Sequence, residues 1–482
     1  LKTCIGNKCL MIMDRPTGVF INYLTVCCQS LSIKKMIELT QEELKQYFSE
    51  PIFGHIAETA DALGLECYVV GGYVRDIFLQ RPSKDIDVVV VGSGIAMAEA
   101  LGKRLGRGAY VSVFKNFGTA QVKYKGTEVE FVGARKESYQ RDSRKPIVED
   151  GTLEDDQNRR DFTINAMAYN HNTGLVDIFG GREDIDRKVI RCVGNPTERF
   201  TEDALRILRA IRFSAQLGFE IEDATRQAIT EIAPNLIHVS KERIQVELTK
   251  LLLSDRPQTM KLVYETGISP YVSETFHKMG EMLADMPITV PAKKALRWAL
   301  FLRKGTPEQS VRILRDLKLD NDTIYQVKVL TGWIERSICG EIALPDGKTD
   351  EMCTLETAAE LEFMPGIESK PQIRKVMSQM EPELFDDLLN IKLCLAKEAA
   401  KDKDSKSVAV RQLERICALR DEIRADGDCI SLKMLAVTGN DLIKAGMKPG
   451  KEVGQTLHHF LELVLEEPEK NSREYLLGML KV

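Results

Sequence analysis

The stretch of sequence that decides the fold runs from residue 67 to residue 91 and reads CYVVGGYVRDIFLQRPSKDIDVVVV. Its segment 85–91 (DIDVVVV) has the nearly continuous apolar character of a buried strand, and the shorter apolar run 67–70 precedes a pair of glycines. We therefore predict a mixed α/β region near the start of the chain, with further strands at 109–114, 119–124 and 127–132.

Most of the remaining chain is predicted to be helical. Residues 41–64 carry apolar residues at helical spacing, whereas residues 133–158 are polar and are predicted to form a flexible loop. From about residue 200 onward, helical periodicity dominates. The fold class is therefore α+β, and the predicted domains are an extension (1–35), an α/β head (36–180), a helical neck (181–265), a helical body (266–390) and a helical tail (391–482).

The first 35 residues differ from the rest of the chain. They begin with Leu1, contain four of the cysteines, and show neither a clear period nor the pattern of a signal peptide. We expect Met36 to open the functional chain. The preceding segment would then be an extension from another start site or a non-native addition.

The amino-acid composition excludes several classes of protein. The 482 residues are 43% hydrophobic and 29% charged, which excludes a mainly disordered or collagen-like chain. A net charge of −5 argues against a generally basic nucleic-acid coat protein but is compatible with a local basic groove. No run of about 18 apolar residues is present, so no membrane-spanning helix is predicted. Eleven cysteines without a CxxC pair indicate free thiols and a cytoplasmic protein.

Two carboxylates open the buried strand. Because side chains alternate along a strand, Asp85 and Asp87 point to one face about 7 Å apart, and Ile86 points to the other. Neighbouring acids repel each other unless a cation lies between them, and Mg²⁺ prefers such oxygen ligands. A third carboxylate would come from Glu128 or Glu130, and we favour Glu130. The alternative is a strand end with two solvated acids.

Gly71 and Gly72 follow the first apolar run and precede Arg75. Glycines at such a turn let the backbone approach a ligand closely, and a following helix presents free N–H groups and the positive end of its dipole. These features suit a triphosphate, with Arg75 as a further cation. In isolation, the same glycines would fit an ordinary tight turn.

The order and spacing of several motifs resemble those of the class II tRNA nucleotidyltransferases and bacterial poly(A) polymerases. The motifs are GGYVRD (71–76) with DID (85–87), RRDFTINA (159–166), DIFGG (177–181), EDALR (202–206) and SKERI (240–244) with Glu247. Two later segments resemble the CCA-adding members, namely RWA (297–299) and DLIKAGMKPGKEVG (441–454). The resemblance implies a polymerase β-like nucleotidyltransferase head, an all-helical neck, body and tail, and Mg²⁺ held by Asp85 and Asp87.

The resemblance assigns Arg160, Asp161 and Asn165 to the ribose and phosphate of an incoming ribonucleotide. An arginine can bind phosphate, and a carboxylate can accept hydrogen bonds from ribose hydroxyls. Asn165 lies four residues after Asp161, so the two side chains would share a face if the segment is helical. Standing alone, Arg160 and Asp161 would instead be interpreted as a surface ion pair.

Glu202, Asp203 and Arg206 are predicted to select the base. On one continuous helix, Asp203 and Arg206 would be i,i+3 neighbours, and Glu202 could hold Arg206 from position i,i+4. Cytosine and adenine both present an amino donor beside a ring-nitrogen acceptor, so a carboxylate and a guanidinium can pair with either base, whereas guanine and uracil would be mismatched. The resemblance assigns the same role. The alternative is an exposed salt bridge of under about 1 kcal/mol.

Three further regions complete the prediction. The polar segment 135–156, which contains RDSRKP at 141–146, resembles the flexible loop that full CCA-adding enzymes need for the final A. The tail resembles a region that reaches the outer corner of tRNA. Basic residues on the neck helices are predicted either to bind tRNA or to be structural, and these are Arg209, Arg212, Lys241 and Arg243.

The sequence thus predicts template-independent addition of CCA to tRNA from CTP and ATP with Mg²⁺, without a membrane or an obligate protein partner. Poly(A) polymerase and CC-only or A-only tRNA nucleotidyltransferases are the alternatives within the family. A distant alternative is an NAD-binding oxidoreductase, because GSG at 92–94 follows a strand. The third glycine position of that fingerprint is occupied by Met97, which argues against it.

Overall fold

The computed structural model describes residues 41–115, 118–138, 147–282, 286, 289–336, 338, 370–400 and 408–481. The chain divides into two compact units, Leu1–Gly54 and His55–Val482. The single helix predicted over 41–64 is wrong, because α2 (Gln41–Tyr47) ends before α3 (Pro51–Leu63) begins. Proline at the first position of α3 disfavours a helical conformation of the residue before it, which separates the two helices.

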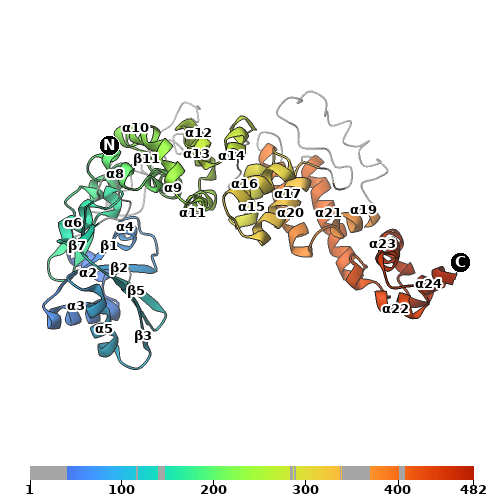
Figure 1. The fold of residues 1–482 in the computed structure, drawn as a ribbon, viewed down its shortest axis with the longest axis horizontal. Coiled ribbons are helices and arrows are strands. Elements are labelled where there is room, and N and C mark those ends of the chain that lie inside the picture. The colour runs from blue at the N-terminus through green and yellow to red at the C-terminus, as the bar shows by residue number, and fades with distance from the viewer. Residues whose placement is uncertain are drawn as a thin grey trace, which may run out of the picture. The chain divides into compact units, whose positions relative to one another are not determined.

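Seven strands form one sheet in the order β3-β4-β5-β2-β1-β8-β9. β2 and β5 run parallel, and the other neighbouring pairs run antiparallel, so the sheet differs from the parallel sheet of a dinucleotide-binding fold. The strands predicted from the sequence are confirmed. They lie in the blue-to-teal part of the chain in Figure 1, and their bounds are β1 (Glu66–Val70), β2 (Asp85–Val91), β3 (Ala109–Phe114), β4 (Thr119–Tyr124) and β5 (Thr127–Gly133). The sheet also contains β8 (Ala168–Asn170) and β9 (Gly174–Val176), which were not predicted.

Helix α5 (Gly94–Leu105) covers one face of the sheet over β3, β4 and β5. The approach is close at Gly94, where a Cβ would lie 2.9 Å from backbone atoms of Val132 and Gly133. Along β2 the burial alternates at first, so that Ile86 is buried while the two acids beside it are exposed. This alternation confirms the predicted orientation of the two acids on one face.

The prediction of a loop over 133–158 is wrong for the part that the structure describes. β6 (Arg135–Ser138) pairs with β7 (Ile147–Asp150), and α6 (Leu153–Asn158) follows. Helix α6 begins in a capping box, in which Thr152 and Asp155 satisfy each other's backbone N–H groups. Within the predicted flexible loop for the final A (135–156), residues 139–146 lie outside the described residues.

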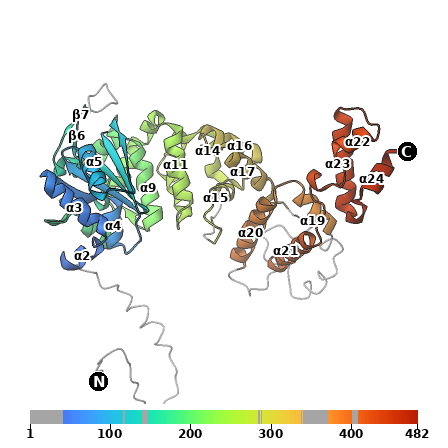
Figure 2. The ribbon, with the colours of Figure 1, turned by 90° about the horizontal axis from the view of Figure 1, so that it is seen from below.

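Beyond residue 196 the described chain is almost entirely helical, as predicted, and Figures 1 and 2 show helices throughout its green-to-red part. The short parallel pair of β10 (Val189–Ile190) and β11 (Glu220–Ile221) is an exception. The seven-residue helix α8 (Pro196–Glu202) begins this part. The longer helices are α9 (Leu205–Leu217), α10 (Asp223–Ile232), α11 (Lys241–Leu252), α15 (Lys294–Leu302), α16 (Pro307–Asp316), α17 (Asn321–Trp333), α19 (Lys370–Met377), α20 (Pro382–Ala399), α21 (Val408–Ala425) and α23 (Lys451–Glu466). Shorter helices include α4 (Gly72–Phe78), α7 (Gly181–Arg187), α22 (Gly439–Lys444) and α24 (Arg473–Gly478).

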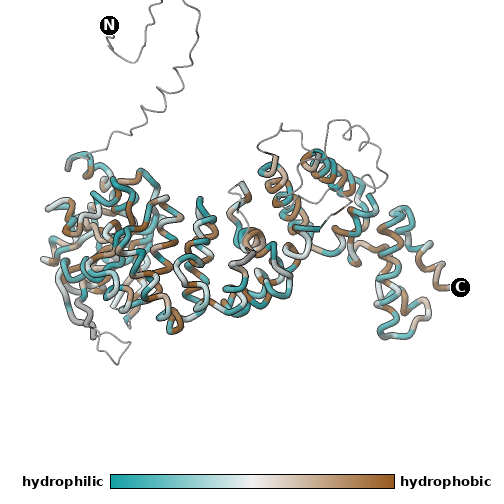
Figure 3. Tube along the Cα trace, turned by 90° about the horizontal axis from the view of Figure 1, so that it is seen from above, coloured by the Kyte–Doolittle hydropathy of each residue, from teal (hydrophilic) through white to brown (hydrophobic). Residues whose placement is uncertain are grey.

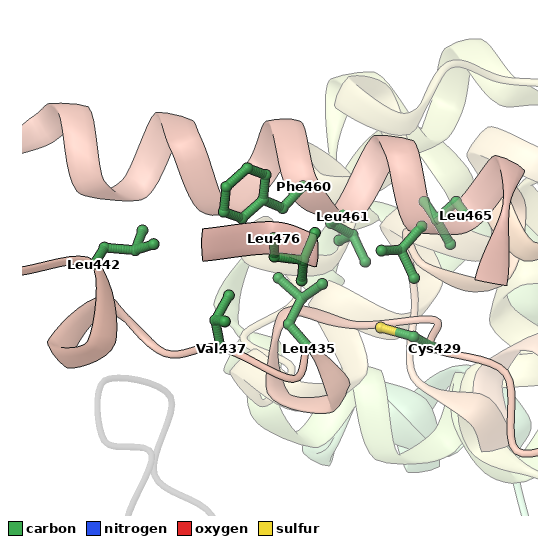
Figure 4. Close-up of a cluster of buried hydrophobic side chains, with 9 residues drawn as sticks. Cys429, Leu435, Val437, Leu442, Phe460, Leu461, Leu465 and Leu476 are labelled. Carbon is green, nitrogen blue, oxygen red and sulfur yellow. The ribbon is translucent and has the colours of Figure 1, made fainter. Parts of the chain in front are cut away.

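Buried side chains join successive helices. Trp298 of α15 is fully buried, and its Nε1 donates to Thr249 Oγ1 of α11 at 3.0 Å. Farther along, the buried Arg374 of α19 donates to the carbonyl of Leu465 on α23 at 2.7 Å. Figure 4 shows the apolar cluster of the last helices, where Phe460, Leu461 and Leu465 of α23 and Leu476 of α24 gather with Cys429, Leu435, Val437 and Leu442.

Hydrophobic and hydrophilic residues alternate along the helices, as Figure 3 shows by colour. Such alternation is typical of helices that bury one face against a protein core and leave the other to water. Among the helices within the described ranges, none has both the length and the apolar character needed to cross a membrane.

Candidate active site

Four carboxylates line up on the open face of β2 and β5, and we name them the acid row: Asp85, Asp87, Glu128 and Glu130. In the register of the two parallel strands, Asp85 lies opposite Glu128 and Asp87 lies opposite Glu130. Glu128 accepts from Gln121 Nε2 at 2.9 Å and pairs with a lysine of β4. Within the described part of the chain, no hydrogen bond or ion pair engages the other three carboxylates.

The pKa of Asp87 reflects the crowding of charge in the acid row. Although the residue is exposed, the surrounding protein partly removes its carboxylate from water, and this desolvation raises the pKa. The negative charge of Glu130 raises it further, the guanidinium of Arg160 lowers it, and Asp85 adds another increase. A cation between these acids would relieve their repulsion.

The acid row fits a divalent ion that arrives with a phosphate ligand. In the parts of the chain that the structure describes, no three carboxylate, thiol or imidazole groups converge into a complete metal site. Mg²⁺, however, usually takes only one or two protein carboxylates and completes its shell with water and substrate phosphates. Two acids on one strand, neither with a hydrogen-bond or ion-pair partner among the described residues, therefore suffice as the protein's share of such a site.

A cavity of about 700 Å³ opens beside Asp87 and Glu130. Gly71 lies next to it with φ at +73°, and a Cβ there would sit 3.3 Å from Arg160 Nη1 and 3.9 Å from Asp87 Oδ2. The structure thus brings Gly71 and Asp87, from one sequence motif, beside Arg160 of the separate motif at 159–166. The cavity is also lined by Val70, Phe114, Thr119, Gln121, Val132, Arg135, Arg159 and Arg160.

Asp156 orients the arginines beside this cavity, and the sequence analysis missed it. Its fully buried carboxylate accepts from Arg159 Nε at 3.0 Å, and from Arg160 Nε and Nη2 at 3.0 and 2.8 Å. The residue belongs to α6, within the stretch predicted to be a loop. The capping pattern Thr152-x-x-Asp155 was the signal that could have revealed this helix and its buried acid.

A second acidic centre lies between the RRDFTINA segment (159–166) and the neck helices α9 and α11. Asp161 Oδ2 accepts from Arg209 Nε at 2.7 Å, and its Oδ1 accepts from Asn165 Nδ2 at 3.2 Å. Arg209 lies 4.0 Å from Glu247, which pairs with Arg212 at 2.5 Å. We name these five residues, Asp161, Asn165, Arg209, Arg212 and Glu247, the neck network.

The neck network keeps Asp161 ionised despite its burial. Desolvation alone would raise the pKa of Asp161, but the positive charge of Arg209 and the hydrogen bonds from Asn165, Arg209 and the Phe162 N–H outweigh it, so the pKa is lowered. Asn165 closes a short 3-10 turn (Thr163–Asn165) and not an α-helix. Its side chain nevertheless binds Asp161, so the two lie on the same side although the helical condition of the prediction is not met.

Arg75 extends from α4 to the neck network. Its Nη1 donates to Asn165 Oδ1 at 2.7 Å, and its Nη2 pairs with Asp76 at 2.9 Å. The ring of Phe213 in α9 lies 5.3 Å from the Arg75 guanidinium and also contacts those of Arg209 and Arg212, at 5.4 and 3.9 Å. Stacking on one aromatic ring helps three like charges to pack together.

The predicted base-selecting residues do not lie on one helix. α8 ends at Glu202 and α9 begins at Leu205, and Asp203 between them has an extended backbone with φ −145° and ψ 99°. The predicted contact of Glu202 with Arg206 is confirmed at 2.9 Å, and Arg206 Nη2 also donates to the carbonyl of Arg159 at 2.8 Å. The Arg206 guanidinium is therefore fixed from two sides.

The i,i+3 neighbour relation predicted for Asp203 and Arg206 on a helix is wrong. Asp203 Oδ1 accepts from the N–H of Leu205 at 3.2 Å, and a side chain that bonds to the backbone two residues on interrupts a helix. Its Oδ2 accepts instead from Arg243 Nη2 of α11 at 2.7 Å. The two residues are 40 positions apart in the sequence, so no local sequence pattern could predict this pair.

The four basic neck residues predicted to bind tRNA or to be structural differ in their surroundings. Arg212 is buried against Glu247, and Arg209 belongs to the neck network. Lys241 Nζ donates to the carbonyls of Tyr271 and Val272. The side chain of Arg243 remains 52% exposed.

Models of known protein families match three parts of the chain. The model described as "Poly A polymerase head domain" matches residues 67–191, and "Probable RNA and SrmB- binding site of polymerase A" matches residues 218–279. A model of tRNA nucleotidyltransferase domain 2 matches residues 389–480. The first match contains the acid row and the RRDFTINA segment at 159–166. Polymerase β-like nucleotidyltransferases of this kind typically use a divalent metal ion.

Whole-chain relatives agree with the family models. The CCA-adding enzyme of Lactobacillus delbrueckii subsp. bulgaricus is 31% identical over 434 residues, which cover 89% of this chain and 96% of the relative. That of Lacticaseibacillus paracasei is 31% identical over 448 residues, or 92% of this chain and 97% of the relative. The crystal structure of the Bacillus stearothermophilus CCA-adding enzyme in complex with CTP superposes with a TM-score of 0.66 at 26% identity, covering 90% of this chain and 97% of the other. The chain therefore belongs to the class II CCA-adding enzymes of the poly(A) polymerase/tRNA nucleotidyltransferase family, and it is a tRNA nucleotidyltransferase.

Proposed function

We propose that this chain adds CCA to the 3′ ends of tRNA without a nucleic-acid template, using CTP and ATP with Mg²⁺. The observation that carries the proposal is the 2.8 Å hydrogen bond from Arg206 to the carbonyl of Arg159, because Arg159 also lines the cavity beside Asp87 and Glu130. The base-selecting residues and the acid row are thus adjacent through one chain of contacts. The curated relatives, which are CCA-adding enzymes aligned along most of the chain, support the same activity.

The acid row would serve the chemical step. Asp85 and Asp87 would hold the divalent ion, and Glu130, opposite Asp87, would complete the catalytic carboxylates. Bound Mg²⁺ supplies positive charge that favours ionisation of the terminal ribose hydroxyl and stabilises the pyrophosphate leaving group. The ribose 3′ oxygen forms a bond to the α-phosphorus, the bond to pyrophosphate breaks, and the hydroxyl proton passes to solvent water.

The incoming nucleotide would be held by the residues around Gly71. The backbone of Gly71 and Gly72 would approach the triphosphate, with Arg75 beside it. Arg160, whose Nη1 lies close to Gly71, would contact phosphate or ribose. Asp161 and Asn165 would support this group, because Asn165 binds both Asp161 and Arg75.

Base selection would rest on Asp203 and Arg206. The carboxylate accepts from the amino group of cytosine or adenine, and the guanidinium donates to the ring nitrogen. Glu202 holds the Arg206 guanidinium at 2.9 Å, so its donors cannot turn freely to suit guanine or uracil. Rejection follows because the mismatched polar groups would be left unpaired.

The deciding experiment separates CCA addition from the alternatives within the family. The protein is incubated with Mg²⁺ and tRNA that ends before CCA, and with CTP and ATP separately and together, and product length is read on a sequencing gel. We expect two added residues with CTP alone and three with both nucleotides. Arrest after CC identifies a CC-only enzyme, and long ATP-dependent tails identify a poly(A) polymerase.

Two further substrates and one chelation control complete the experiment. A primer tRNA that already ends in CC detects A-only activity, because such an enzyme extends it and leaves the shorter primer untouched. Chelation of divalent ions should stop every addition, and restored Mg²⁺ should recover it. Addition that persists in the chelator would overturn the metal assignment but leave the nucleotide assignment intact.

A further inference from the structure

Asp203 lies in a gap between two helices, so its carboxylate depends on a few contacts for its orientation. The residue follows the last turn of α8 and precedes α9, with an extended backbone. Its Oδ1 caps the N–H of Leu205 at 3.2 Å, and its Oδ2 accepts from Arg243 at 2.7 Å. We propose that Arg243 is a positioning residue that sets the specificity of nucleotide selection through Asp203, an inference that rests on the proposed function.

The two arms of the base-selecting pair are held very differently. Arg206 Nη1 donates to Glu202 and to the carbonyl of Arg199, both at 2.9 Å, while its Nη2 donates to the carbonyl of Arg159 at 2.8 Å. Among the residues that the structure describes, Asp203 binds the Leu205 N–H and one side-chain partner, Arg243. Loss of the Arg243 contact would therefore loosen the acceptor arm while the donor arm stays fixed.

Arg243 is itself placed by a well-anchored helix start. Ser240 caps the first turn of α11 by accepting from the N–H of Arg243 at 3.4 Å. Lys241 donates to the carbonyl of Tyr271 at 2.9 Å, and the following Ile244 is fully buried. The guanidinium that reaches Asp203 thus comes from a fixed backbone.

The carboxylate keeps capacity for a nucleobase while Arg243 is bound. An ionised carboxylate offers about four lone-pair directions for accepting hydrogen bonds. The hydrogen bonds from Leu205 and Arg243 to Asp203 occupy only some of these directions. One arginine can therefore fix the plane of the carboxylate while a remaining lone pair accepts from the amino group of cytosine or adenine. A guanidinium is suited to this task because its planar donors impose direction.

A surface ion pair without a role in selection is the competing interpretation, and the chain offers a matched control for it. Arg226 and Glu265 form an ion pair at 3.5 Å in which the arginine side chain is 52% exposed, the same value as for Arg243. Arg226 lies on α10 and contacts none of the residues assigned to nucleotide selection. Replacing it tests what loss of one half-exposed arginine does by itself.

The experiment compares wild type, Arg243→Gln, Arg243→Lys and Arg226→Gln with tRNA primers and each of the four nucleotides. We expect Arg243→Gln to lower the preference for CTP over UTP, and for ATP over GTP, by roughly tenfold, as loss of a charged hydrogen bond suggests. Arg243→Lys should recover part of that preference, and Arg226→Gln should leave it unchanged. In an Asp203→Ala background, Arg243→Gln should cause no further loss.

The outcomes separate this inference from its rivals. A higher KM for tRNA with unaltered nucleotide preference would show that Arg243 binds the RNA backbone, and would overturn the proposal. An additional loss of preference in the Asp203→Ala background would also overturn it, because Arg243 would then act elsewhere. Wild-type protein is assayed first: if it selects no C or A, the proposed function fails, whereas normal selection in wild type and in Arg243→Gln defeats only the positioning role.

Discussion

The acid row and the neck network both gather carboxylates within the same part of the chain, but their partners differ. Asp85, Asp87 and Glu130 have no hydrogen-bond or ion-pair partner among the described residues, whereas Asp161 and Glu247 are each bound by arginine. An exposed acid can leave its charge for a ligand, but a buried acid must be neutralised by the protein itself. This difference in partners is what we expect if the acid row holds a ligand and the neck network holds the scaffold around it.

The two groups are nevertheless connected. Arg160 lowers the pKa of Asp87, and its Nη1 also reaches the carbonyl of Asn165 at 3.3 Å. Asn165 in turn binds Asp161 and Arg75. Substitutions in the neck network should therefore shift the arginine side chains at the proposed nucleotide site. Substitutions in the acid row should leave the fold intact. The following predictions test that asymmetry.

The largest effect is expected from Asp87→Ala. Under the proposed function this carboxylate is a metal ligand, and without it we expect nucleotide addition to fall by about a thousandfold or more, with thermal stability and tRNA affinity nearly unchanged. Single-turnover addition, thermal unfolding and a tRNA-binding assay measure the three quantities. Glu128→Gln is the matched variant, since Glu128 already has Gln121 and Lys123 as partners, and it should cost far less. Equal losses in both variants would contradict the distinction.

Glu247→Gln should act in the opposite way. Removing the charge leaves Arg212, which is 6% exposed, without its counter-ion, and we expect a loss of about 3 kcal/mol in unfolding free energy. Chemical denaturation measures it. The control is Glu265→Gln, which breaks a half-exposed ion pair and should cost under about 1 kcal/mol. If the two variants unfold at the same denaturant concentration, the neck network is not the scaffold we describe.

Gly71→Ala should raise the KM for nucleotides by about tenfold, because φ is +73° and strain at such a position costs about 1–3 kcal/mol. The new Cβ would also lie 3.3 Å from Arg160 Nη1. Gly72→Ala is the comparison, since its Cβ would meet Arg75 Nη2 at an ordinary 3.6 Å. Steady-state kinetics with CTP and ATP should give a much higher KM for Gly71→Ala than for Gly72→Ala. A higher KM for Gly72→Ala would reject the close approach at Gly71.

The smallest effect concerns the pH dependence of stability. The folded-state pKa of Asp161 is lowered from 3.8, so its ionised form stabilises the fold above the ordinary aspartate pKa, and this contribution is lost as the pH falls through the folded value. The Asp161→Asn variant has no carboxyl group at this position, so it shows no pH dependence of stability from residue 161. We expect the stability gap between the two proteins to be constant above about pH 5 and to narrow below about pH 4. Denaturation across this range would contradict the assignment if the gap widened toward acid.

Much of the head could be predicted because its signals are local. The apolar run after Asp87 and the alternation around Ile86 placed a strand and the side of its acids, and both are confirmed. The segment 133–158 misled the prediction, because its many polar residues indicated a loop, although Asp156 is buried there beneath two arginines. A buried charged residue looks like a solvated one until its partners are known.

The sequence by itself determined the first five strands of the sheet, the shared face of Asp85 and Asp87, and the reach of Glu202 to Arg206, because each depends on the period of a strand or on spacing within a few residues. Only the tertiary structure decided that Asp203 binds Arg243, 40 residues away, and that Arg209 neutralises Asp161, 48 residues away. Helix packing sets those distances, and it depends on the side-chain contacts of the whole core, which no local repeat encodes.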